Sequence, residues 1–99
     1  MSSVELICEA IRKRALLEFL YHDRRRVVAP YCCGVSSRGA DVLRAVQVRG
    51  GSTSGGLGFG KLWALAEIAD LRMLDEMFTP DDPNYNPRDR AMTRIYCAI

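Results

Sequence analysis

The sequence predicts a mainly β fold with one N-terminal helix, built as a small curled antiparallel sheet or barrel. The chain has 99 residues, the length of one domain. Its first residues have apolar positions at helical spacing, and the remainder falls into short alternating segments separated by turns. We therefore expect a single domain over 1–99, with a helix at about 3–13, a barrel at about 15–78, an irregular segment at 79–91 and a closing strand at 92–99.

The helix is predicted from its cap and its apolar stripe. Ser2 or Ser3 can cap its first turn, and Glu5 suits the positive end of the helix dipole. Cations occupy the last turn, where the dipole favours them. The apolar stripe comprises Val4, Ile7, Cys8 and Ile11.

The strands are predicted from two-residue alternation and β-branched or aromatic content. Pro30 interrupts the second strand and indicates a sheet edge, a bulge or a bend, because proline donates no ladder hydrogen bond. The stretch Ala69–Leu74 either continues the strand before it or forms a fifth one, although Leu65, Ile68 and Leu71 also fit helical spacing. The remaining predicted strands are 16–21, 26–35, 42–49, 61–65 and 92–99.

Two segments are predicted to be irregular. Residues 50–60 contain six of the chain's 8 glycines, so they have high backbone entropy and little to bury, which predicts a mobile loop. Residues 79–87 contain three prolines and two asparagines and are expected to form no regular structure.

Composition excludes some classes of protein. Hydrophobic residues make up 48% and charged residues 26%, as in ordinary globular chains. The net charge of +2 is too small by itself to indicate nucleic-acid binding. No apolar run approaches the roughly 18 residues that cross a bilayer, and charges interrupt the first twenty residues, unlike a signal peptide. We expect a cytoplasmic protein with no membrane partner.

The 4 cysteines are expected to be reduced and mostly buried. Cys32 and Cys33 are adjacent, so a strand would send them to opposite faces. The chain has no C-x-x-C pair and a single histidine, His22, which does not match zinc-ligand spacing. No metal site and no cofactor are predicted.

Patterns typical of enzymes are incomplete. The segment Gly55–Lys61 fits G-x-x-x-x-G-K, but Leu62 stands where a P-loop needs Ser or Thr, and a strand rather than a helix is predicted to follow. His22 and Asp23 read as solvated turn residues, and no serine sits in a G-x-S-x-G elbow. We expect no catalytic residues and no enzymatic activity.

Cations interleaved with aromatic residues are the most informative feature. Bases of single-stranded nucleic acid stack on rings while guanidinium groups neutralise phosphates. The same pattern also fits a plain solvent face for the arginines and a core position for the only tryptophan. The candidate ligand-binding residues are Tyr21, Arg25, Arg26, Tyr31, Arg44, Lys61 and Trp63.

The order of these pieces resembles the WYL domain family of bacterial regulators, over about residues 4–75. The family's leading helix motif appears at Ile7, Ala10 and Ile11, and its R-x-V-x-P spacing at Arg26, Val28 and Pro30. Of the naming triplet only Leu43 is kept. The family's F-R-L-D-R-I strand falls on residues 63–68, with its apolar positions kept and its charges lost.

The resemblance implies an SH3-like or Sm-like β-barrel of about five strands that serves in transcriptional regulation as a ligand-sensing module. Its expected partner is a nucleotide-like effector or single-stranded nucleic acid bound on a basic face. The alternative is a structural protein that forms homo-oligomers through its sheet edges, since a small open sheet leaves strands unpaired.

Overall fold

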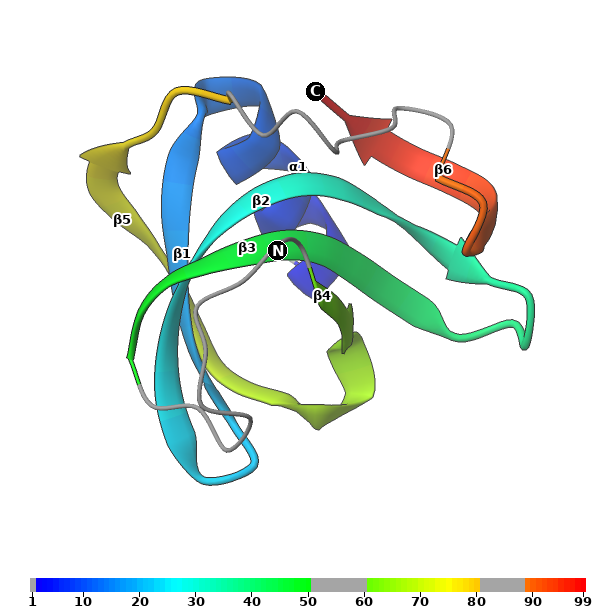
Figure 1. Cartoon of the computed structure of the whole chain (residues 1–99), viewed down its shortest axis with the longest axis horizontal. Helices are drawn as coiled ribbons and strands as arrows, with labels where there is room; N and C mark the ends of the chain where they lie inside the picture. Colours follow the sequence, from blue (N-terminus) through cyan, green and yellow to red (C-terminus); the bar gives the residue numbers. More distant parts are fainter. Residues whose placement is uncertain (1, 51–60, 81–88) are drawn as a thin grey trace.

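The computed structural model describes residues 2–50, 61–80 and 89–99 (Figure 1). One α-helix is followed by six strands and a single 3-10 turn. In chain order these are α1 (Ser3–Lys13), β1 (Ala15–Tyr21), β2 (Arg24–Ser36), β3 (Asp41–Gly50), β4 (Lys61–Ala64), η1 (Leu65–Glu67), β5 (Ile68–Met77) and β6 (Met92–Ala98). The loop predicted at 50–60, apart from Gly50 at the end of β3, lies outside the described residues, and so does most of the irregular segment predicted at 79–87.

Helix α1 begins and ends where the sequence predicts. The Ser2 side chain accepts a hydrogen bond from the Glu5 N–H at 3.1 Å, which satisfies one of the free donors of the first turn. Arg14 ends the helix in the left-handed conformation with φ of 59°. Its buried residues, Ile7, Ala10 and Ile11, pack against the sheet, and the helix contacts β1, β2, β5 and β6.

The sheet is antiparallel and is organised around the long strand β2. Along one edge, β2 pairs with β3. Along the other edge, its first half pairs with β1 and its second half, from Cys32 to Ser36, pairs with β6. The strand order is β4-β3-β2-β1-β5, with β6 off this path (Figure 1).

The mainly β class with an N-terminal helix is confirmed. In the described part of the chain there are six strands rather than about five, and the sheet is not closed into a barrel. Strands β4 and β5 stand at the two ends of the strand order, and the short turn η1 connects them without pairing them.

Pro30 lies within β2 at a position that is paired with neither β1 nor β6, so its missing N–H removes no hydrogen bond to either strand. The β1 register ends at Val28 and the β6 register begins at Cys32, so the missing N–H falls between the two neighbours. The pairing of β2 with β3 shifts register immediately afterwards, between Pro30 and Cys32. Pro30 therefore marks a register irregularity within an interior strand and not a sheet edge.

The segment after β4 is a turn followed by a full strand. Residues Leu65–Glu67 form η1, and Ile68–Met77 form β5, which pairs with β1. The prediction that 69–74 form a fifth strand is confirmed. The helical spacing of Leu65, Ile68 and Leu71 does not correspond to an α-helix here. Asp70 adopts a φ of 54°, and the β1–β5 register shifts at this level, between Glu18 and Leu20.

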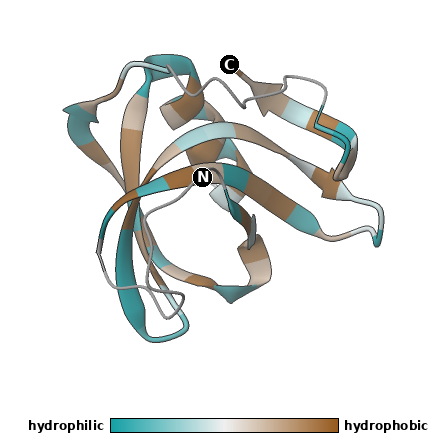
Figure 2. Cartoon of the chain, in the orientation of Figure 1, coloured by the Kyte–Doolittle hydropathy of each residue, from teal (hydrophilic) through white to brown (hydrophobic). Residues whose placement is uncertain are grey.

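The core lies between α1 and the concave side of the sheet. It joins the buried face of α1 to β1 and to the middle of β2 and β3, and Trp63 from β4 is fully buried in it. Figure 2 shows the middle of these strands as hydrophobic and the tip of the β1–β2 hairpin as hydrophilic. Two of the four candidate cations, Arg25 and Arg26, lie on β2 close to this tip.

Candidate functional site

The β1–β2 hairpin places two of the candidate cations, Arg25 and Arg26, on opposite faces of the sheet. Phe19 pairs with Arg26, and Leu20 pairs with Arg25. Because successive strand residues point to opposite faces, Arg26 enters the core while Arg25 faces outward. His22 and Asp23 form the turn, both with positive φ, at 52° and 63°.

Four of the predicted binding residues meet in one place, which we call the aromatic–cation cluster: Tyr21, Arg26, Lys61 and Trp63. The Trp63 and Tyr21 rings contact edge to face, with centroids 4.9 Å apart. The Arg26 guanidinium carbon lies 5.5 Å from the Trp63 centroid, and the Lys61 Nζ lies 5.1 Å from it. Two cations therefore share one indole, each within the range of a cation–π contact.

Arg26 is 1% exposed, which is unusual for a charged side chain. Its Nη2 donates to the Tyr21 carbonyl oxygen at 3.0 Å, and its Nη1 makes a longer bond of 3.4 Å to Gln47 Oε1. Its Nε is buried with no hydrogen-bond partner. Among the residues that the structure describes, no carboxylate forms an ion pair with Arg26 or Lys61.

Tyr21 connects this cluster to η1. Its hydroxyl donates to Glu67 Oε2 at 3.3 Å and accepts from the Ala64 N–H at 3.2 Å. Burial raises the pKa of this hydroxyl. The other Glu67 oxygen lies 2.7 Å from His22 Nε2, and the His22 ring stacks on Tyr21. Glu67 therefore ties the hairpin tip to the start of β5.

The outward-facing Arg25 belongs to a separate group of charges. It lies 2.9 Å from Asp70 and 3.5 Å from Glu18, and Arg72 contacts the same two carboxylates. The hydrogen bond with Arg25 lowers the pKa of Asp70. Two cations and two anions balance here, so this face has little net positive charge.

Arg44 and Tyr31 lie apart from the aromatic–cation cluster. Arg44 binds Asp89 through two contacts of 2.7 Å and 3.2 Å, and this pairing lowers the pKa of Asp89. Tyr31 is 4% exposed and packs against Phe78, with centroids 5.6 Å apart, in a second core cluster.

The structure thus gathers four of the seven predicted residues and separates Arg25, Tyr31 and Arg44 from them. All three rings are packed inward, so the folded chain presents none of them as an open platform for stacking bases. Sequence reasoning missed the carboxylates that neutralise the arginines. Asp70 and Asp89 each lie 45 positions from their partners, Arg25 and Arg44, and no local pattern signals such pairs.

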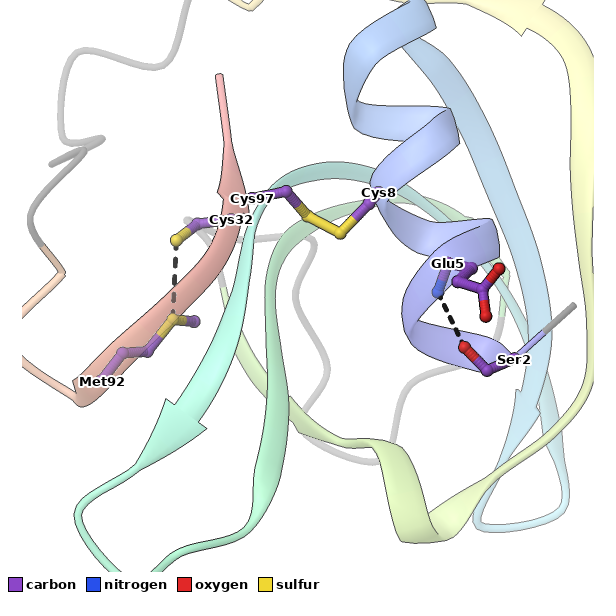
Figure 3. Close-up of a disulfide and its surroundings, with 6 residues drawn as sticks. All are labelled: Ser2, Glu5, Cys8, Cys32, Met92 and Cys97. Carbon is purple, nitrogen blue, oxygen red and sulfur yellow. Dashed lines mark hydrogen bonds between the residues drawn. A yellow bond between two sulfur atoms is a disulfide. The ribbon is translucent and has the colours of Figure 1, made fainter.

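The expectation of four reduced cysteines is wrong. Cys8 on α1 and Cys97 on β6 form a disulfide with a Cα–Cα distance of 5.7 Å (Figure 3). Both lie on apolar faces that pack on the same core, and this was the available sequence signal. Cys32 and Cys33 are free and buried, and burial raises their pKa values to about 11 and about 12. The cytoplasmic location loses the support it drew from reduced thiols and stays a prediction.

The described residues contain no cluster of three or more metal-ligating side chains of the His, Cys, Asp and Glu types. Within the same ranges, no helix has both the length and the apolar character needed to span a membrane. Lys61 begins a strand, so the described end of the glycine-rich motif lacks the helix that a P-loop requires. Comparison with protein-family models, curated proteins and solved structures finds no match for this chain.

Proposed function

We propose that this chain is a non-enzymatic binding module of SH3-like or Sm-like arrangement, resembling WYL domains, which takes an anionic nucleotide-like ligand or a short single strand beside the aromatic–cation cluster. The observation that carries the proposal is that Arg26 and Lys61 approach the same Trp63 ring and form no ion pair with a carboxylate of the described residues.

The physical argument is one of charge balance. Moving a charged side chain from water into a protein interior costs roughly several kcal/mol, even after the surrounding protein relaxes, unless a group of opposite charge compensates the cost. Arg26 donates hydrogen bonds to two neutral oxygens and lies over two rings, but it forms no ion pair with a carboxylate of the described residues. An anion bound at the exposed Lys61 would supply that counter-charge. Recognition in this form is electrostatic and does not require bases to stack on the buried rings.

The test is a titration of a fluorescent short oligothymidylate at two salt concentrations. Affinity should fall as salt rises, because phosphate contacts release condensed counterions. Lys61→Ala should weaken binding several-fold. The control is Arg25→Ala, because Asp70 and Glu18 already neutralise Arg25 and its loss should change affinity little. No binding at low salt, or equal effects of the two variants, contradicts the proposal.

Arg26→Met provides a second measurement. It removes the buried charge and keeps an apolar chain of similar length, and replacing buried ions by apolar residues is often neutral or stabilising. We expect a chain at least as stable as the parent that binds the oligonucleotide more weakly. A large loss of stability would indicate that Arg26 serves the fold alone.

A second candidate function is assembly through sheet edges, favoured by the exposure of β6. This strand pairs with β2 on one edge only, within the described residues. Its Ile95 and Tyr96 are 37% and 41% exposed. An open edge with exposed apolar side chains is a template for another strand. Light scattering of the oxidised protein should show a mass that rises with concentration, and Ile95→Lys should prevent the rise. A monomer at every concentration contradicts this candidate.

A further inference from the structure

Strand β6 is largely exposed in the described structure, and a disulfide joins it to α1. Of its seven residues only Met92 is buried, and Cys97 is half-buried. Its register against β2 shifts twice, between Cys33 and Gly34 and between Val35 and Ser36. Figure 3 shows the Cys8–Cys97 bond crossing from α1 to this strand. Few side chains of β6 are therefore buried, and the covalent bond joins this strand to α1 rather than to its pairing partner.

The β2 edge that receives β6, from Cys32 to Ser36, is shaped for a closely approaching backbone. A Cβ on Gly34 would overlap the Arg94 carbonyl oxygen and would lie 2.9 Å from Met92 Sδ. Only glycine accommodates a strand this close. This edge, which we call the β6 seat, therefore fits the β6 backbone specifically.

Besides its contacts to α1, β6 is held in its seat by contacts to the adjoining parts of β2 and β3. The Tyr96 hydroxyl donates to Asp41 Oδ1 at 2.9 Å, and the Ile99 N–H donates to the Tyr31 carbonyl at 2.9 Å. Met92 Sδ lies 3.5 Å from Cys32 Sγ (Figure 3). A β6 strand from a second copy of the chain would make the same contacts, because none depends on which chain supplies the strand.

We propose that reduction of the Cys8–Cys97 disulfide frees β6, and that two reduced copies exchange this strand, each placing its β6 in the other's seat. The proposal goes beyond assembly through sheet edges, which uses the open edge of β6, because exchange uses the β2 edge that β6 leaves. Exchange of an identical element is a low-cost route to a dimer, since it repeats intramolecular contacts between chains.

The redox steps balance without any further component of the protein. A dithiol reductant supplies two electrons and two protons, giving the thiols of Cys8 and Cys97, and itself closes to a cyclic disulfide. Oxidised glutathione reverses the change and is released as two molecules of glutathione. In an exchanged dimer, reoxidation joins Cys8 of one copy to Cys97 of the other. Because each chain's own β6 competes at high effective concentration, exchange should increase with protein concentration.

The decisive experiment mixes two variants, Cys8→Ser and Cys97→Ser. The first retains only Cys97 of the pair and the second only Cys8, so neither can form the bond within one chain. If strands exchange, concentrating the mixture and oxidising it with glutathione gives a covalent heterodimer joined through Cys8 and Cys97. Either variant alone should stay at monomer mass in denaturing gels. Absence of the heterodimer, or joining through Cys32 or Cys33 instead, overturns the proposal.

The parent protein provides an independent check, and two glycine variants control it. Reduced, concentrated and reoxidised parent should shift from monomer to covalent dimer mass, whereas protein that was never reduced should not. Gly34→Ala blocks the seat and should lose the dimer. Gly39→Ala places strain at a φ of 82° with no neighbour within 4 Å, so it should keep the dimer. Equal dimer yields from both variants, or a reduced parent that unfolds completely, contradict the exchange. Concentration-dependent mass in the oxidised parent tests the edge-assembly function separately.

Discussion

Removing the Cys8–Cys97 disulfide tests the main unexpected feature of the fold. The bond joins residues separated by 89 positions, so it closes almost the whole chain into one loop. In the chain-entropy view, a cross-link of this span lowers the entropy of the unfolded chain enough to contribute about 4.5 kcal/mol to the free energy of unfolding. For a chain of this length that corresponds to a decrease in melting temperature of roughly 20 °C.

The measurement compares urea denaturation of the oxidised parent, the parent in a dithiol, and the double variant Cys8→Ala, Cys97→Ala. Both routes to loss of the bond should give the same decrease in the free energy of unfolding. Cys32→Ala is the control, because Cys32 is a free, buried thiol, and this variant should respond to the dithiol as the parent does. A difference below about 1 kcal/mol between oxidised and reduced parent would refute the entropic reasoning.

Three further predictions follow from single contacts. Asp89→Asn should lower the free energy of unfolding by about 2 kcal/mol at neutral pH. Because pairing with Arg44 lowers the Asp89 pKa below its ordinary 3.8, this contribution is complete above that value and is lost as the pH falls through the lower, folded-state pKa. Parent and variant should then converge in acid, as measured by urea denaturation at several pH values, and a pH-independent difference contradicts the assignment. Trp63→Phe should cost about 2 kcal/mol, since it leaves a void and removes the indole N–H bond to the Ala45 carbonyl; a calorimetric melt with no change would show that this site is not packed. Cys32 and Cys33 should resist iodoacetamide at pH 8 in the native protein and react in denaturant, as followed by mass spectrometry, because burial raises their pKa values to about 11 and about 12; rapid labelling of the native protein contradicts their burial.

The arrangement of the candidate site shows how packing and charge divide the predicted residues. Tyr21, Tyr31 and Trp63 supply large apolar surfaces to a small core, and a chain of 99 residues has few other groups of that size. The rings therefore turn inward. Arg25 forms an ion pair with Asp70 of β5, and Arg44 forms one with Asp89, which precedes β6.

Local sequence was sufficient for the elements whose cause is local. The Ser2 cap, the apolar stripe and the terminal cations define α1 at Ser3–Lys13, because helix spacing and dipole effects act within one or two turns. Alternation over a few residues likewise located β1, β2 and β3. The position of Pro30 predicted an irregularity, although the sequence left open whether it marked an edge, a bulge or a bend.

Tertiary structure alone decided which distant groups meet. Cys8 and Cys97 become neighbours only when β6 pairs with the far half of β2 beside α1. Arg26 meets the Trp63 ring only when β4 pairs with β3. Such contacts depend on strand pairing between segments tens of residues apart, which composition and periodicity do not encode. The sequence by itself therefore determined the class of fold and the supply of cations and rings. The three-dimensional pairing determined which charges form ion pairs within the described residues and which cysteines are bonded.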